Sequence, residues 1–374
     1  MQTLTFRLSL LLLASLCIVF RTPETYAQGD RTIRLNQIQV IGTHNSYHAG
    51  IAPSEMTIWK AKNAEAVKGL EYKHQTLSQQ LDSGVRQIEL DIFADSKGGL
   101  YADPNGPHIV AAVHLPADPP FDPEGVMQKP GFKVLHMQDI DYRSTCQTFV
   151  ACLKEVRAWS TSHPNHIPLF ILVETKTEQP RPGVQKTVPE PFTSTTFDSL
   201  DAEIRSVFQP SELITPDDVR GRYDTLNQAV LAGNWPTLAA ARGKVAFLMD
   251  QSWAGPIYRE GHPSLRGRIL FTNATPGEPD AAFIERNDGP AAEIAALVRQ
   301  GYLIRTRTDD STREARTNST ARRDAMTLSG AQILSTDYPA SEPAEWEGHY
   351  SVSLPDNVAA RCNPVIAPAS CKLD

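Results

Sequence analysis

The sequence predicts an α/β protein of one domain, built as a distorted (β/α)8 barrel of the TIM type. Eight short runs are rich in Val, Ile, Leu or Phe, as strands that are buried on both faces usually are. Helical patterns separate several of these runs, which indicates parallel strands, and eight such strands favour closure into a barrel. The expected strands cover residues 38–41, 85–93, 133–136, 169–174, 245–249, 268–271, 302–306 and 332–335.

Helices and loops are expected between these strands. Helical patterns cover residues 57–80, 147–162, 199–208, 290–299 and 312–328, and the last is followed by the stop signal Ser329-Gly330. Residues 95–130 are rich in Pro and Gly and have no helical period, so one crossover helix is expected to be missing there. Residues 177–195 form a second irregular loop. Because no linker separates two cores, we expect residues 28–374 to form a single domain.

The first 27 residues predict a secretory signal peptide. Arg7 precedes an apolar run over residues 8–20, and residues 25–27 (TYA) offer a small residue for cleavage. The run is too short for the bilayer core, which needs about 20 apolar residues. We therefore expect a secreted or periplasmic protein.

The cysteines agree with export. Four cysteines follow the predicted signal peptide, and four cysteines allow three pairings. The local pairing of Cys146 with Cys152 and of Cys362 with Cys371 needs the least rearrangement of the chain, and we expect it. A zinc site is the alternative, but no tight CxxC motif and no nearby pair of histidines supports it.

The charge limits the partners. The chain has 36 Lys and Arg against 43 Asp and Glu, a formal net charge of −7. A nucleic-acid partner would need a basic face, so none is expected. The negative charge also disfavours long-range attraction to anionic bilayers. Transient membrane contact would therefore rely on apolar residues such as Ile51, Ile58 and Trp59, which could equally belong to the core. We expect a monomer.

Polar side chains follow the first two predicted strands, at the end of a barrel where functional groups gather. His44 and Asn45 come directly after the first strand. In the second strand, the period of two places Glu89 and Asp91 on one face. An exposed edge strand would also show this alternation, but two buried carboxylates on one face need a cation.

The third and fourth predicted strands end in the same way. His136 ends the third, and Glu174 follows a five-residue apolar run in the fourth. A buried Glu needs a partner, and Lys176 on the same face could be that partner. Asn45, Glu89, Asp91 and Glu174 together offer only oxygen ligands, which suits Ca²⁺ or Mg²⁺, and export favours Ca²⁺. His44 and His136 are then the candidate acid and base, although a lone His after a strand is usually structural.

Several of these segments resemble the phosphatidylinositol-specific phospholipase C superfamily, most closely its secreted, Ca²⁺-dependent bacterial members. The segments are residues 41–47 (IGTHNSY), 89–91 (ELD), His136, 170–174 (FILVE), 304–309 (IRTRTD) and 330–339 (GAQILSTDYP). The resemblance covers residues 36 to 340. Two features depart from the superfamily's eukaryotic signalling enzymes: His136 is followed by MQDID rather than a Gly-rich stretch, and no regulatory domain is present.

The resemblance implies a distorted barrel that binds Ca²⁺ through Asn45, Glu89, Asp91 and Glu174. It also implies cleavage of a phosphatidylinositol at the glycerol side of the phosphodiester, with the inositol 2-hydroxyl as the internal nucleophile. The products would be diacylglycerol and inositol 1,2-cyclic phosphate, which can be hydrolysed further. His44 and His136 would handle the protons, in an order that the sequence leaves open.

Three further residues are weaker candidates for contacts to phosphate and sugar: Lys176, Arg305 and Tyr338. For Arg305, an ion pair with Asp309 or Asp337 inside the barrel is an equal alternative.

Two other functions remain as alternatives. A glycerophosphodiester phosphodiesterase would share the barrel, but such enzymes have His-Arg-Gly after the first strand, where this chain has His44-Asn45-Ser46. A secreted headgroup-binding protein without catalytic activity is the second alternative.

Overall fold

The computed structural model describes residues 29–373 and contains a closed parallel barrel, as predicted. Each barrel strand is hydrogen-bonded to the next, β10 pairs with β1, and a single parallel bridge between Asn273 and Phe283 joins β7 to β8. The predicted signal peptide lies outside the described residues. In order around the barrel, the strands are β1 (Ile38–Thr43), β2 (Gln87–Phe93), β4 (Leu169–Thr175), β6 (Val245–Met249), β7 (Leu270–Phe271), β8 (Phe283–Glu285), β9 (Leu303–Arg307) and β10 (Ile333–Thr336).

The barrel is distorted at two places. The β7–β8 seam has only the bridge just described, and β1 meets β2 in register only at Gly42 opposite Gln87. A Cβ atom on Gly42 would lie 2.0 Å from the side-chain oxygen of Gln87, so only glycine allows this approach. β2, β4 and β6 pair over most of their lengths, and these three strands form the regular part of the barrel.

Four helices lie where helical patterns were predicted: α4 (Phe149–Ser162), α5 (Ser194–Val207), α10 (Ala291–Arg299) and α12 (Ala321–Leu328). A further helix between β6 and β7, α9 (Ala254–Tyr258), was not predicted. The hydroxyls of Thr148 and Thr193 accept hydrogen bonds from backbone N–H groups at the starts of α4 and α5, which fixes where these helices begin. α4 buries Phe149, Leu153 and Val156 in the main core.

The prediction that residues 133–136 form a barrel strand was wrong. β3 (Lys133–Val134) runs antiparallel to β2, with Val134 opposite Ile92. The chain folds back over the end of β2 here, and the buried ammonium of Lys133 lies 3.1 Å from Asp95. The eighth barrel strand is instead β8, whose three residues were too few to predict.

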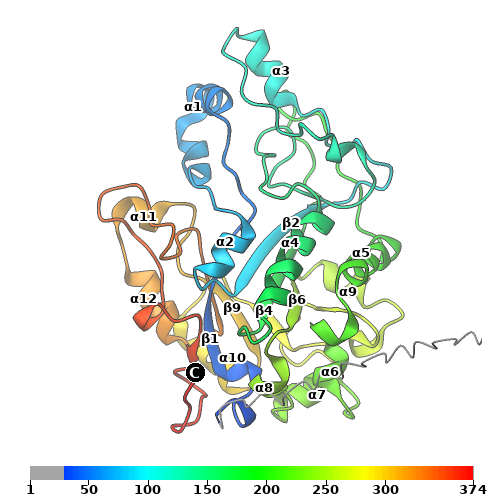
Figure 1. Cartoon of the computed structure of the whole chain (residues 1–374), viewed down its shortest axis with the longest axis vertical. Helices are drawn as coiled ribbons and strands as arrows, with labels where there is room; N and C mark the ends of the chain where they lie inside the picture. Colours follow the sequence, from blue (N-terminus) through cyan, green and yellow to red (C-terminus); the bar gives the residue numbers. More distant parts are fainter. Residues whose placement is uncertain (1–28, 374) are drawn as a thin grey trace, which may run out of the picture.

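Residues 95–130 contain one short α-helix, α3 (Asn105–Ala112), although they show no helical period. It is no crossover helix, because it lies with α1 (Pro53–Val67) at one end of the molecule (Figure 1). The predicted helix 57–80 is divided between α1 and α2 (Leu77–Asp82), and 312–328 is divided between α11 (Arg313–Thr317) and α12.

The remaining elements cover the opposite end of the barrel or flank β1. β5 (Leu213–Ile214) pairs with the start of β6, and α6 (Pro216–Arg220), α7 (Leu226–Leu231) and α8 (Leu238–Ala241) lie far from α1 and α3 (Figure 1). β11 (Arg361–Cys362) runs antiparallel to the start of β1.

The apolar residues considered for membrane contact belong mainly to the interior. Ile58 and Trp59 are buried in a small second core with Val110 and Ile140, and Ile51 packs against it. This core joins α1 to α3. Within residues 29–373, no helix is long and apolar enough to cross a membrane.

Both predicted disulfides are confirmed. Cys146 is bonded to Cys152 near the start of α4, and Cys362 is bonded to Cys371 near the end of the chain.

Candidate active site

The candidate site lies where the strands of the barrel end, at a cavity of about 550 Å³. His44, which follows β1, and His136, which follows β3, both line this cavity, together with Tyr72 and Asp337. The structure thus brings both predicted histidines together, although β3 is no barrel strand.

Three carboxylates form a cluster at the ends of β2 and β4. One oxygen each of Glu89, Asp91 and Glu174 lies within 4.8 Å of the others. Asp91 and Glu174 are direct register partners on neighbouring strands, and Glu89 and Asp91 are fully buried. Neither oxygen of Asp91 has a hydrogen-bond partner within the described chain. Buried carboxylates need a cation, so this cluster could hold a metal ion.

Asn45 offers a neutral oxygen at the turn after β1. Its backbone is left-handed, with φ of 46°, and its amide nitrogen donates to the hydroxyl of Tyr72 at 2.8 Å. Its buried side-chain oxygen has no hydrogen-bond partner among residues 29–373. The next residue ties this turn to β2, since the Ser46 hydroxyl accepts from the N–H of Glu89 at 2.8 Å. Four oxygen donors, three of them anionic, are the ligand set of Ca²⁺, so the residues present fit that ion.

Two buried cations also contact the acidic cluster. The Lys176 ammonium lies 2.9 Å from Glu174 and 3.4 Å from Asp91, so the predicted partner of Glu174 is confirmed. The Arg305 guanidinium binds Glu89 and lies 2.9 Å from Glu285. The alternative of an ion pair inside the barrel therefore holds for Arg305, but with Glu89 and Glu285 in place of Asp309 and Asp337.

Burial shifts the proton affinities of the cluster. It raises the pKa of Glu89 to about 7 despite the opposing charge of Arg305. Burial and the charge of Glu174 raise the pKa of Asp91 well above its usual range. Burial would also raise the pKa of Glu174, but the ammonium of Lys176 holds it below its usual value. A divalent cation on these oxygens would keep all three carboxylates ionised.

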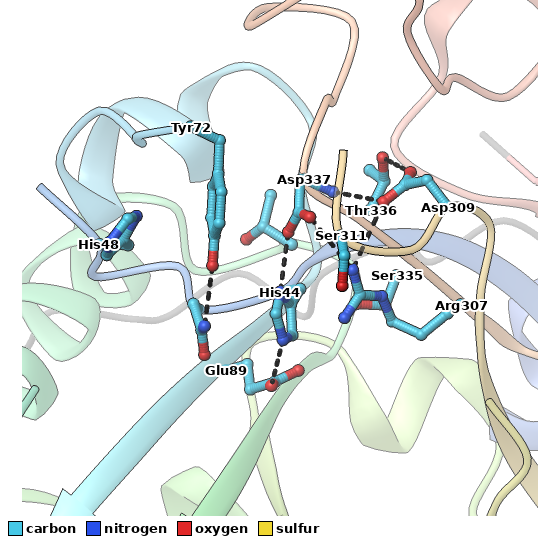
Figure 2. A network of polar contacts seen from close by, with 12 residues as sticks. His44, His48, Tyr72, Glu89, Arg307, Asp309, Ser311, Ser335, Thr336 and Asp337 are labelled. Atoms are coloured by element: carbon cyan, nitrogen blue, oxygen red, sulfur yellow. Dashed lines mark hydrogen bonds and ion pairs between the residues drawn. The ribbon is translucent and has the colours of Figure 1, made fainter. Parts of the chain in front are cut away.

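His44 is held between two carboxylates (Figure 2). Its Nδ1 lies 2.8 Å from Asp337, and its Nε2 lies 3.7 Å from Glu89. Burial, followed by the charge of Arg307, lowers the pKa of His44 to about 3. Arg307 also lies 3.1 Å from Asp337 and, against the effect of burial, holds the pKa of that carboxyl below its usual range. A neutral His44 that donates from Nδ1 to Asp337 leaves the lone pair on Nε2.

His136 has its own aspartate. Its Nδ1 lies 2.8 Å from Asp141, whose oxygens also lie 2.8 Å from Nε2 of His48. His48 is fully buried. Burial alone would lower the pKa of His48, but Asp141 raises it above the usual value. Since Asp141 engages Nδ1 of His136, the Nε2 atom of His136 remains for a ligand in the cavity.

Tyr338 lies apart from the two histidines. Its buried hydroxyl has no hydrogen-bond partner within residues 29–373, and its ring packs edge-on against Trp346 and Tyr350. It lines a second cavity, of about 920 Å³, which shares Tyr72 and Asp337 with the cavity of the two histidines. The ring contacts of Tyr338 show a packing role, and its contact with a ligand stays a prediction.

Four residues of the site were missed in the sequence: His48, Asp141, Arg307 and Asp337. A signal existed for two of them. Arg307 lies two residues after Arg305 on the same strand, and Asp337 follows the last predicted strand, so both occupy positions where functional groups gather. No local pattern marks Asp141, which lies in a loop.

Comparisons with known proteins agree with this geometry. The family model described as phosphoinositide phospholipase C, Ca²⁺-dependent, matches residues 33–364. A search of curated protein sequences gave no match.

Solved structures share the fold. A calcium-dependent phosphoinositol-specific phospholipase C from the Gram-negative bacterium Pseudomonas sp. is 16% identical, with a TM-score of 0.53 over 90% of this chain and 97% of that one. The same enzyme's myoinositol complex gives a TM-score of 0.52 at 16% identity, over 89% and 96% of the two chains. A Ca²⁺-dependent phosphatidylinositol-specific phospholipase C from Streptomyces antibioticus is 20% identical, with a TM-score of 0.50 over 82% and 95%. Because the family model spans nearly all of the described barrel, this chain belongs to the Ca²⁺-dependent phosphoinositide phospholipase C family.

Proposed function

We propose that this chain is a Ca²⁺-dependent phospholipase C that cleaves phosphatidylinositol into diacylglycerol and inositol 1,2-cyclic phosphate, which is then open to hydrolysis. One observation carries the proposal: two histidines, each bound to an aspartate, line one cavity beside a buried cluster of carboxylates. The signal peptide predicted for residues 1–27 and the two disulfides support export of the enzyme.

Asn45, Glu89, Asp91 and Glu174 would hold the calcium ion. Bound there, calcium would neutralise charge on the phosphate and lower the pKa of the attacking hydroxyl. The side-chain oxygen of Asn45 and Oδ1 of Asp91 support this assignment, because each would gain the partner that it lacks among the described residues.

His44 is the better candidate for the general base. Asp337 holds Nδ1 and keeps the lone pair on Nε2, and Nε2 lies 3.7 Å from Glu89, one of the proposed calcium ligands. Nε2 would take the proton of the inositol 2-hydroxyl as the bond between that oxygen and phosphorus forms. Asp337 would then stabilise the imidazolium.

His136 would be the general acid. It would donate a proton to the glycerol oxygen as the bond between that oxygen and phosphorus breaks, which releases diacylglycerol as a neutral alcohol. Asp141 orients the ring from the Nδ1 side. Hydrolysis of the cyclic product would use the same two histidines with reversed roles and water in place of glycerol.

The test is ³¹P NMR of the products formed from phosphatidylinositol vesicles, with Ca²⁺ or with a chelator. We expect cyclic inositol phosphate only with Ca²⁺. The Ca²⁺ concentration that gives half-maximal activity should rise at least about tenfold in Asp91→Asn, because one anionic ligand is lost. The matched control is Asp103→Asn, which changes a carboxylate that is 73% exposed and lies outside the cluster. Turnover that persists in chelator would contradict the calcium requirement. A phosphorus-containing product in which the phosphate is still bonded to glycerol would favour the glycerophosphodiester alternative.

A further inference from the structure

The ammonium of Lys176 lies among the carboxylates that are proposed to bind calcium. Lys176 follows the last residue of β4, and its backbone N–H donates to Ile92 at 2.9 Å, which fixes it beside β2. Its side chain is only 10% exposed. The ammonium lies 2.9 Å from Oε1 of Glu174 and 3.4 Å from Oδ2 of Asp91. It therefore binds two of the three anionic groups in the cluster.

A calcium ion on this cluster and the ammonium would share the same anions. The two cations would repel each other at short range inside a buried site, where screening by water is weak. Each contact that Glu174 and Asp91 make with Lys176 also stabilises the cluster without calcium. Both effects lower the free energy that calcium binding can release.

Arg305 differs from Lys176 in its freedom to move. Besides Glu89, its guanidinium binds Glu285, Asn287 and Ser335, so several partners fix it. Lys176 contacts only carboxylates, and one more carboxylate is near: Oε1 of Glu178 lies 4.0 Å away and its side chain is 61% exposed. Glu178 gives the ammonium a place to move toward solvent when calcium binds. Of the two cations, Lys176 is therefore the one that calcium can displace from the carboxylates.

We propose that Lys176 is a built-in competitor of calcium that weakens the metal site, rather than a contact to the substrate phosphate. The inference rests on the proposed function, since it takes the acidic cluster as the calcium site. Calcium sites in extracellular modules bind with dissociation constants of about 10⁻⁴–10⁻³ M, and the number of charges on the ligands sets that value. Lys176 removes net charge from the cluster and so tunes it to surroundings that are rich in calcium.

The test is calorimetric titration of the full chain with calcium chloride, which does not depend on activity. Lys176→Met should bind calcium at least about tenfold more tightly than wild type, a gain of about 1.4 kcal/mol. Lys176→Arg keeps the charge and should bind weakly, as wild type does. Lys186→Met is the matched control, because it removes the same charge from a lysine that is 44% exposed and paired with Asp103. It should leave the affinity unchanged.

Thermal unfolding gives a second readout. In chelator, Lys176→Met should unfold at a lower temperature than wild type, because Asp91 and Glu174 lose their neutralising partner. Added calcium should therefore raise its Tm by more than it raises that of wild type. If the methionine variant does not fold, Lys176→Gln makes the same comparison and keeps a hydrogen-bond donor for Glu174.

The outcomes separate this inference from the proposed function. Equal or weaker calcium affinity in Lys176→Met and Lys176→Gln, with measurable binding in wild type, would overturn the competition and leave the proposed calcium site in place. Wild-type protein that binds no calcium at millimolar concentrations would overturn both.

Discussion

The two histidines of the site have the same immediate partner and different surroundings. Each donates from Nδ1 to an aspartate at 2.8 Å. Behind Asp337 lies the permanent cation Arg307, whereas behind Asp141 lies a second histidine, His48. Asp337 comes from the far end of the sequence, 293 residues from His44, and Asp141 lies five residues from His136.

This difference teaches how one motif can serve two roles. Burial, followed by the charge of Arg307, lowers the pKa of His44, so this ring stays neutral and keeps a lone pair on Nε2. Asp141 has no arginine or lysine partner in the described structure and instead shares its charge between two imidazoles. Asp141 thus fixes the Nδ1 side of His136 without a permanent cation behind it, and Nε2 faces the cavity for the proposed transfer to the leaving group.

The largest expected effect is the loss of either ring. His44→Ala and His136→Ala should each lower kcat by about 10²–10⁴-fold and retain calcium affinity. The double variant should lose little more, because the two residues act as a unit. A substrate with a good leaving group should rescue His136→Ala far more than His44→Ala in steady-state assays.

The control for these variants is His108→Ala, an exposed histidine paired with Asp103. Near-wild-type rates in both single variants would contradict the phospholipase proposal and favour the headgroup-binding alternative.

A smaller effect is expected from the two aspartates. Asp337→Asn and Asp141→Asn should each lower kcat by about 10–100-fold, by analogy with partners that orient metal-bound histidines. Their stabilities should differ. Asp141→Asn leaves the buried His48 without a counter-charge and should cost on the order of 3 kcal/mol in urea unfolding. Asp337→Asn should cost less, since Arg307 keeps Asp309 at 3.6 Å. Equal losses of stability would remove the distinction between the two pairs.

The smallest effect is a change in how stability depends on pH. The pKa of folded His48 lies above its usual value of 6.5, so its protonation stabilises the fold fully below pH 6.5 and this contribution is lost as pH rises through the folded pKa. Asp141 faces His48 directly, and Asp337 acts from further away. In His48→Gln, Tm should therefore fall less than in wild type as pH rises above about 6.5. If the curves of Tm against pH run parallel for wild type and His48→Gln, His48 does not titrate in this pH range.

The regular half of the barrel was predictable and the irregular half was less so. β1, β2, β4 and β6 are apolar runs, and the acidic residues in β2 stand out against them because alternation is a local pattern. β8 has only three residues and joins β7 by a single bridge, so no local pattern marks it as a strand. β3 was misread because residues 133–136 contain the apolar pair Val134-Leu135, and the direction of a strand is not a local property.

The same limit applies to the site. His44, Asn45, Glu89, Asp91, His136 and Glu174 could be identified since each follows or belongs to a recognisable strand. Arg307 and Asp337 gain their roles only when β9 and β10 pair and bring both beside β1. Asp141 and His48 meet across 93 residues through loops, for which no periodicity exists.

The pairing of β1 with strands from the end of the chain has a consequence for when the site can form. β1 is bordered by β10, and its start is also bordered by β11. A chain on which β9 and β10 have not yet been synthesised therefore has His44 without Asp337 and Arg307. The proposed base is completed only after these two strands have paired beside β1.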